Sequence, residues 1–418
     1  MENLETDVVV IGAGASGLMA AKLLAASGRN VMVLEAKPRC GGRIHTYTDG
    51  QFQEPIELGA EFIHGDLPLT MALAKEANLE TVAVSDNYYT YDGNKLRINE
   101  GNKLHKEIEL ELQKQKTDLT VDEFLSRLGN KVSDAVKDEV RGYVSGYYAA
   151  EVSKGSTLAL QEEWFTPSGA DKRLRSGYGK LITYLQSCCN KLGVLVKLEI
   201  PVESVNWGAE KVTVRAGKQL FDCKQVLVTA PLGVLQAHTI NIHPFPQILK
   251  QALASFGFGA VIKFQFQFKT AFWSDAAPRL GMLFSREEIS TWWTQHPATN
   301  NVLTGWVAGD GALPLVALNR FQLKEKALQS LSNIFKIPVY ELEKDVTAWY
   351  INNWNKGPFA RGGYSFATVA GESWKRNNQP YFENRLFFAG ECWYSGKEIG
   401  TVEAALQTGK AAATAMMG

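Results

Sequence analysis

The start of the chain alternates between apolar runs and helical spacing in an order that predicts a strand, a helix and a second strand. A β-branched apolar run covers residues 7–11, and a glycine-rich turn then opens an alanine- and leucine-rich stretch at 16–26. A second buried strand is expected at 31–34. This order is typical of a βαβ unit, so we expect a parallel, doubly wound sheet.

The hydrophobic pattern then changes over a long segment in which we expect the chain to leave this sheet. We call this segment the first excursion. From 68 to about 161 the spacing is mostly that of polar helices, with a short strand-like stretch at 88–91. The run Thr120-Val-Asp-Glu123 is a capping box, the signal of a helix start. An inserted domain is therefore expected here.

The chain then returns to the first sheet and leaves it once more. We expect a helix at 177–192, followed by strands at 202–207, 212–215 and 225–229 that rejoin the sheet. A proline-punctuated segment at 243–246 begins the second excursion, which has an alternating strand at 261–268 and an amphipathic helix near 323–335. At the end, a strand at 385–389 and a helix of small residues at 401–416 suit a nucleotide-binding domain.

Composition narrows the classes of partner. The 418 residues are 45% hydrophobic, enough for large cores and for two domains rather than one. Lysine plus arginine and aspartate plus glutamate number 44 each, so no overall field favours nucleic acid or an anionic membrane as a partner.

Cysteine usage and the N-terminal sequence indicate the compartment. The N-terminus lacks a secretory signal, and no apolar run approaches the roughly 20 residues that span a bilayer. We expect a soluble cytoplasmic protein with neither a membrane partner nor a metal site, because the cysteines are odd in number and show no paired metal-ligand spacing. These are Cys40, Cys188, Cys189, Cys223 and Cys392.

The first motif with chemical meaning is Gly12-Ala-Gly14-Ala-Ser-Gly17, between the first strand and its helix. Glycines at these places let the backbone approach a diphosphate at the helix N-terminus. Glu35 ends the second strand, where a carboxylate accepts hydrogen bonds from both ribose hydroxyls and repels a 2′-phosphate. The pair favours FAD or NAD over NADP, and a tight turn without a ligand is the alternative.

A second motif, Arg39-Cys-Gly-Gly-Arg43, follows directly. Its arginines can reach a phosphate while the glycines keep the backbone close to a flat ring, although the same residues also suit a surface turn.

In order and spacing, these motifs together with Glu57-Leu-Gly-Ala-Glu-Phe-Ile-His-Gly65 resemble the flavin amine oxidases. The likeness continues through 256–263, 354–366, 388–391 and 400–405, so it covers most of the chain, and it is closer to the polyamine-oxidase-like branch than to membrane monoamine oxidases. It implies an α/β fold, with a Rossmann-type FAD-binding domain at 1–66, 176–242 and 345–418. This domain is interleaved with a substrate domain of antiparallel sheet flanked by helices at 67–175 and 243–344.

The resemblance also implies which residues contact FAD. They are Gly12, Gly14, Ala15, Ser16, Gly17, Glu35, Ala36, Arg39, Gly42, Arg43, Gly59, Ala60, Glu61, Phe62, Val202, Trp354, Gly390, Glu391, Thr401 and Val402. Monoamine oxidases attach flavin to a cysteine just before the tyrosine that matches Tyr364. Because this chain has Gly363 there, we expect the FAD to be held without a covalent bond.

Three residues are expected at the reacting groups. Lys263 lies in an alternating apolar strand, where an unpaired ammonium is costly, and the resemblance implies that it holds a water against flavin N5. Tyr364 matches one wall of an aromatic slot beside the flavin, while the place of the second aromatic is taken by Thr401. His64 matches a histidine that polyamine oxidases carry near the substrate, and a structural hydrogen-bonding role is its alternative.

The reaction implied is oxidation of an amine, polyamine or monoamine, with hydride transfer to flavin N5, reoxidation by oxygen and release of hydrogen peroxide. Glu61, Glu162 and Glu163 are acids able to face a distal ammonium, and a solvated or structural role is the alternative for each. Two other classes stay open: a flavin desaturase of carotenoids or porphyrinogens, and a flavin-binding scaffold without catalysis.

Overall fold

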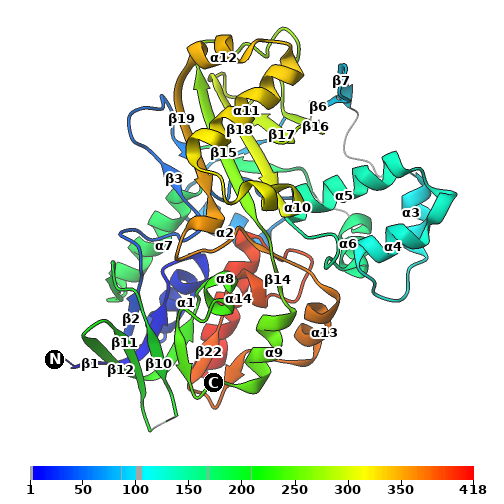
Figure 1. The fold of residues 1–418 in the computed structure, drawn as a ribbon. Helices are drawn as coiled ribbons and strands as arrows, with labels where there is room; N and C mark the ends of the chain where they lie inside the picture. The colour runs from blue at the N-terminus through cyan, green and yellow to red at the C-terminus, as the bar shows by residue number, and fades with distance from the viewer. Residues whose placement is uncertain (1–2, 86, 100–105, 167–168, 209) are drawn as a thin grey trace.

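The computed structural model describes residues 3–85, 87–99, 106–166, 169–208 and 210–418, and it is organised around two large sheets (Figure 1). In the view of Figure 1, the sheet that contains β1 lies below and the sheet that contains β15 lies above, with a group of helices beside the upper sheet. Within the described residues, no helix combines the length and the apolar character needed to cross a bilayer.

The first sheet runs in the order β13-β10-β11-β12-β1-β2-β9, with β22 beside β12 and β21 beside β22. Strand β1 pairs in parallel with both β2 and β12, which confirms the predicted βαβ unit. The bounds are Asn3–Ile11 (β1), Val31–Leu34 (β2), Leu195–Lys197 (β9), Ser204–Asn206 (β10), Val212–Ala216 (β11), Gln219–Val228 (β12), Asn241–His243 (β13), Tyr381–Phe382 (β21) and Leu386–Phe388 (β22).

The sheet is mixed, since β11 is antiparallel to β10 and β12, and both faces of its parallel part are covered, as parallel strands require. Val8 and Val10 pack on one face with Leu18, and Val9 packs on the other with Leu235. The helices involved are Ala15–Ala26 (α1), Gly179–Lys191 (α7), Leu232–Gln236 (α8), Gln247–Ser255 (α9), Val369–Asn377 (α13) and Val402–Met417 (α14).

The second sheet runs in the order β19-β15-β18-β17-β16-β6-β7, and its neighbours are antiparallel except for the parallel pair β6 and β16. Strand β19, in the part that the sequence assigns to the FAD-binding domain, pairs with β15 in this sheet. The bounds are Tyr88–Tyr91 (β6), Leu96–Asn99 (β7), Val261–Phe268 (β15), Met282–Ser285 (β16), Thr291–Thr294 (β17), Val302–Ala308 (β18) and Val346–Asn353 (β19).

The alternation along β15 gives this sheet two different faces. Phe264 and Phe266 turn to a core shared with Leu328 of helix α11. Lys263 and Gln265 turn to the opposite face, where Gln265 donates to the carbonyl of Glu57 at 3.0 Å. The polar face of the second sheet therefore packs against the segment around Glu57. The helices of this half are Gly309–Ala312 (α10), Arg320–Phe335 (α11) and Val339–Asp345 (α12).

The first excursion forms the helical group, and its predicted capping box is confirmed at Thr120 and Glu123. Helix α5 ends at Ala149, whose left-handed φ of 53° turns the chain back toward the sheet. The helices are Pro68–Glu76 (α2), Lys106–Gln113 (α3), Val121–Arg127 (α4), Asp134–Tyr148 (α5) and Thr157–Phe165 (α6). The short strands are Thr46–Tyr47 (β3), Ile56–Glu57 (β4), Thr81–Ala83 (β5), Lys172–Leu174 (β8), Gly257–Phe258 (β14) and Ser365–Phe366 (β20).

Helix α2 is fixed to helix α14 by one buried carboxylate. Glu403 accepts hydrogen bonds from the backbone N–H groups of Leu69 and Thr70 at 3.0 and 2.7 Å, and from the Thr70 hydroxyl at 2.7 Å. The N–H groups at a helix start have no partner inside their own helix, so an acid from α14 satisfies them. This contact holds the start of the excursion against the first sheet.

Candidate active site

A cavity of about 1360 Å³ connects the two sheets. It begins at the carboxyl ends of β1 and β2, where Gly12 and Glu35 lie, and it ends among aromatic side chains on the face of the second sheet that carries Lys263. Ligands of doubly wound folds bind at this edge of the first sheet.

The glycine-rich turn is shaped to hold a phosphate. A Cβ on Gly17 would lie 2.0 Å from the Gly12 carbonyl oxygen, so only glycine allows this close turn. A Cβ on Gly14, in contrast, would meet nothing within 4 Å. The Ser16 hydroxyl next to this space is buried and has no protein partner among the described residues. The turn thus offers both room and an unused donor to a diphosphate at the start of α1.

Glu35 is oriented by the backbone around it. One carboxylate oxygen accepts a hydrogen bond from the Ala13 N–H at 2.8 Å, and the other accepts one from the Lys37 N–H at 2.9 Å. Each carboxylate oxygen has a second lone pair, and Glu35 lines the cavity. The side chain is therefore held ready for the two hydroxyls of a ribose, and the first part of the cavity fits FAD.

The other residues expected at FAD divide into those that line the cavity and those that support it. Arg39 lies outside the lining, because its guanidinium donates to the carbonyls of Cys40, Gly42 and Ile44 and holds the turn together. Gly17 also lies outside the lining. The residues that line it are Ala15, Ala36, Gly42, Arg43, Gly59, Ala60, Glu61, Phe62, Val202, Trp354, Gly390, Glu391, Thr401 and Val402.

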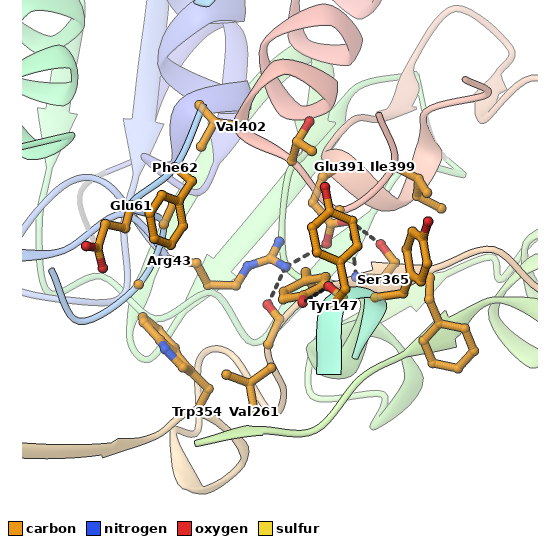
Figure 2. Close-up of a pocket in the computed structure, with 18 of the residues that line it drawn as sticks. Arg43, Glu61, Phe62, Tyr147, Val261, Trp354, Ser365, Glu391, Ile399 and Val402 are labelled. Atoms are coloured by element: carbon orange, nitrogen blue, oxygen red, sulfur yellow. Dashed lines mark hydrogen bonds and ion pairs between the residues drawn. The ribbon is translucent and has the colours of Figure 1, made fainter. Parts of the chain in front are cut away.

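Arg43 and Glu391 form an ion pair in the middle of the cavity. Their closest atoms lie 2.6 Å apart, and the same Arg43 nitrogen donates to the Gly363 carbonyl at 2.9 Å. Figure 2 shows the guanidinium pointing toward Glu391 and Ser365, whose backbone N–H donates to the same carboxylate at 3.3 Å. Three distant segments of the chain meet here. A Cβ on Gly363 would lie 2.3 Å from Val261, so this position has no space for an attachment side chain.

The polar face of the second sheet brings Lys263 and two tryptophans together. Lys263 lies opposite Trp306 in the register of β15 and β18, and its Nζ lies 5.3 Å from the centre of the Trp293 ring. The ammonium donates to the Gly59 carbonyl at 3.1 Å and to the Glu61 carboxylate at 2.6 Å. The lysine is 1% exposed, so the buried charge has the partners that the sequence left unidentified.

Tyr364 is fixed in the aromatic part of the cavity. Its hydroxyl donates to the Tyr147 carbonyl at 2.6 Å, and its ring lies nearly parallel to that of Trp306, with centres 6.3 Å apart and 19° between the planes. Thr401 caps helix α14 by accepting from the Ala404 N–H at 3.2 Å. Next to it, a Cβ on Gly400 would approach the Tyr364 ring to 2.9 Å. The 400–401 turn therefore packs directly against the ring, and only glycine fits at position 400.

His64 and Glu163 lie further along the same lining, while Glu162 is exposed and outside it. The Nδ1 of His64 lies 3.2 Å from Asp171, and its ring meets the edge of Tyr147 with centres 5.3 Å apart. Burial raises the pKa of Glu163 to about 7, against the opposing effects of Tyr148 and of the positive charges of His64 and Lys397.

We call the part of the cavity that is lined by Tyr147, Trp293, Trp306 and Tyr364 the chamber. Sequence reasoning missed three of these aromatic residues. Trp293 and Trp306 come from β17 and β18, two strands that the sequence analysis did not predict, and Tyr147 comes from the last turn of α5. The β-branched and aromatic residues of the run Val302-Leu-Thr-Gly-Trp-Val-Ala308 were the available signal. Once this run is recognised as a strand beside β15, Trp306 is expected on the same face as Lys263.

The doubly wound sheet, the glycine-rich turn at its edge and the cavity that joins it to the second sheet define a dinucleotide-binding protein. The family described as flavin containing amine oxidoreductase matches residues 15–417. The chain therefore belongs to this family, and its cofactor is FAD.

Relatives and solved structures agree with this assignment. Lysine-specific histone demethylase 1 homolog 2 of Arabidopsis thaliana is 26% identical over 93% of this chain and 56% of its own length, and polyamine oxidase 2 of the same plant is 26% identical over 99% and 88%. The chain thus spans little more than half of the demethylase. A structure of putrescine oxidase bound to putrescine has a TM-score of 0.81 at 20% identity and covers the whole of both chains, which confirms the fold.

A metal centre finds no support in the part of the chain that the structure describes. There, no group of three or more histidine, cysteine, aspartate or glutamate side chains is arranged to hold a metal ion.

Proposed function

We propose that this protein is an FAD-dependent amine oxidase that converts a primary or secondary amine to an imine, which water then hydrolyses. Hydride leaves the carbon that bears the unprotonated amine. When bound, FAD supplies the hydride acceptor at N5, and transfer of two electrons to oxygen yields hydrogen peroxide. The observation that carries this proposal is the single cavity that joins the Gly14 and Glu35 cradle to the chamber of Lys263, Trp306 and Tyr364.

The chamber suits an amine without a proton. The rings of Tyr364 and Trp306 and the indole of Trp293 leave little polar surface beside the reacting carbon, and burial of an unpaired ammonium there is costly. The neutral amine is therefore favoured, with its lone pair available as the hydride departs. The fixed rings also restrict the orientation of the carbon, which contributes to the rate by positioning.

We further propose that the preferred substrate has a second positive charge, as in a diamine or polyamine. Glu163 supports this choice, because it is a half-buried carboxyl in the cavity lining, close enough to Tyr364 that its charge, together with burial, raises the pKa of the Tyr364 hydroxyl. An ammonium brought beside Glu163 favours the ionised carboxylate and forms a charge-assisted hydrogen bond.

Glu163→Gln should weaken diamine binding. Loss of one charge-assisted hydrogen bond raises the KM for putrescine or spermidine by about tenfold, whereas the KM for an aromatic monoamine stays the same. The pH dependence has a defined sign. Because the pKa of Glu163 is raised to about 7, the carboxylate forms as the pH rises through that value, so wild-type diamine binding tightens there and the variant lacks this change.

Glu162→Gln is the matched control, since the neighbouring glutamate is exposed and outside the cavity. A peroxide-coupled assay of both variants against diamines and monoamines decides the outcome. Equal changes for diamines and monoamines in Glu163→Gln would reject the diamine preference and leave the amine oxidase proposal intact. Absence of peroxide with every amine in the wild type would reject the oxidase itself.

A further inference from the structure

Lys263 has a specific counter-ion, Glu61, whose geometry leaves one direction open to the ammonium. An ammonium has three N–H donors. One is used by Glu61 at 2.6 Å and a second by the Gly59 carbonyl at 3.1 Å. Because Lys263 also lines the cavity, the third N–H is left to point into it.

Glu61 is itself held from several sides. Its Oε1 accepts from the Trp293 indole at 3.0 Å and from the Gln295 amide at 2.9 Å, while its Oε2 receives Lys263. Arg173 of β8 adds a second cation, with its Nε 3.4 Å from Oε1, at ion-pair distance but without hydrogen-bond geometry. Three of the roughly four lone-pair positions of this carboxylate thus accept from protein donors, so the carboxylate mainly serves the protein.

The charge balance explains why this acid is ionised although it is buried. Burial raises the pKa of Glu61, but the charges of Lys263 and Arg173 outweigh this effect and hold the pKa well below its usual range. Burial lowers the pKa of Arg173, and the Glu61 carboxylate opposes this effect. One anion thus stabilises two buried cations, and removal of a buried charge partner is strongly destabilising.

Arg173 also holds the residues around Glu61 in place. Its guanidinium donates to the Thr294 carbonyl and to the Gln295 side chain, each at 3.0 Å, and lies 4.8 Å from the centre of the Phe62 ring. It therefore ties β8 to the end of β17, from which Trp293 and Gln295 reach Glu61. The carboxylate is fixed relative to the sheet that carries Lys263.

From these contacts we infer that Glu61 is a positioning residue, which aims the Lys263 ammonium into the cavity and keeps it charged at the face of the cofactor. The inference rests on the proposed role of Lys263 in the reoxidation of FAD. In the reoxidation of FAD, Glu61 acts through the lysine, so it has no further effect on this step once the lysine is gone.

A double-mutant cycle with Glu61→Gln and Lys263→Met tests this dependence. Reoxidation by oxygen, measured by stopped flow, should slow about tenfold to a hundredfold in Glu61→Gln. In the double variant it should be no slower than in Lys263→Met alone. Multiplied effects would overturn the inference while the role of Lys263 stands, and wild-type reoxidation in Lys263→Met would overturn the proposed role itself.

Unfolding in urea provides a readout that is independent of activity. Glu61→Gln leaves a buried ammonium without its counter-charge, so this single variant should unfold at a lower urea concentration than the wild type. The added Lys263→Met change removes one of the two cations that Glu61 compensates, Arg173 being the other, so the double variant should recover part of the loss. A double variant that unfolds at a lower concentration than Glu61→Gln would contradict a direct pairing of the two residues.

The pH profile separates positioning from a purely structural effect. The charged and titratable groups that act on Lys263 and its partner are Glu57, Glu61 and Arg173. Because Glu61→Gln removes the opposite charge that lies 2.6 Å from the ammonium, the pH profile of reoxidation should differ between this variant and the wild type. Glu61→Asp, which keeps the charge, should restore the wild-type profile at least in part.

Glu57→Gln is the control for this profile. Glu57 is a buried acid on β4 whose pKa is raised to about 7 by burial, but its carboxylate binds the Thr46 hydroxyl at 2.7 Å and the Tyr178 N–H at 2.8 Å rather than the lysine. Its variant should shift the reoxidation profile less than Glu61→Gln does, because Glu57 acts on the lysine only through its charge and makes no hydrogen bond to it. A profile that shifts equally in Glu57→Gln and Glu61→Gln would refute the specific role of Glu61.

Discussion

Lys263→Met should leave a folded protein that binds FAD but turns over roughly a hundredfold more slowly or worse, the usual scale for a positioned proton-transfer group. Methionine keeps the length of the side chain and removes the charge, and the strand around it is held by the core on one face of β15 and by pairing with β18. Because the third N–H faces the cavity, the loss falls on the chemistry at the cofactor. Stopped flow separates reduction by amine from reoxidation by oxygen, and we expect reoxidation to suffer at least as much.

Lys269→Met is the matched control for this experiment. Lys269 follows directly after β15, is exposed, and donates to the Lys344 carbonyl at 2.6 Å far from the cavity. Its variant should keep wild-type rates in both half-reactions. If Lys263→Met also keeps them, Lys263 has no part in the chemistry and the assignment of the reacting groups is wrong.

Glu35→Ala should weaken FAD binding by about tenfold to a hundredfold, since charge-assisted hydrogen bonds to the ribose worth roughly 1.5 to 3 kcal/mol are lost. The same change releases the N–H groups of Ala13 and Lys37, so the phosphate turn loses part of its support. Titration of the FAD-free protein with FAD, followed by flavin fluorescence, measures the change.

Glu35→Gln refines this measurement. The amide keeps one oxygen acceptor and loses the charge, so its FAD affinity should lie between those of the wild type and Glu35→Ala. FAD affinity that is unchanged in Glu35→Ala would remove Glu35 from the cofactor site.

Much of the fold could be predicted from the sequence, because the hydrophobic pattern of many segments matches the position that each segment takes in the folded protein. The alternation at 261–268 predicts a strand that the structure has with the same bounds, Val261–Phe268, and the glycine turn between β1 and α1 has the expected close backbone approach. The order of helices and strands in the second excursion could be predicted less well from the sequence. Strands β16 to β18 are short or interrupted by glycine, and their pairing depends on partners far away in the sequence.

The residues of the site also divide into those that a local motif predicts and those that only the fold brings together. The residues of the turn and of strand ends, such as Glu35, follow from a local motif, and Lys263 is conspicuous as a charge in an apolar strand. Its pairing with Glu61, 202 positions earlier, arises only when β15 docks on the 57–61 segment. Sequence reasoning placed Glu61 at the cofactor or a distal ammonium, and its hydrogen bonds with Lys263, Trp293 and Gln295 could not be predicted from the local motif.

The central claim, that this protein oxidises amines with FAD, is tested most directly by mixing the FAD-loaded protein with putrescine in the absence of oxygen and following the flavin spectrum. The account predicts rapid bleaching of the oxidised flavin band, at a rate that rises and saturates with putrescine concentration, and recovery of the band when oxygen is admitted. A spectrum that stays oxidised with putrescine, with spermidine and with aromatic monoamines would contradict the account and favour a flavin-binding scaffold.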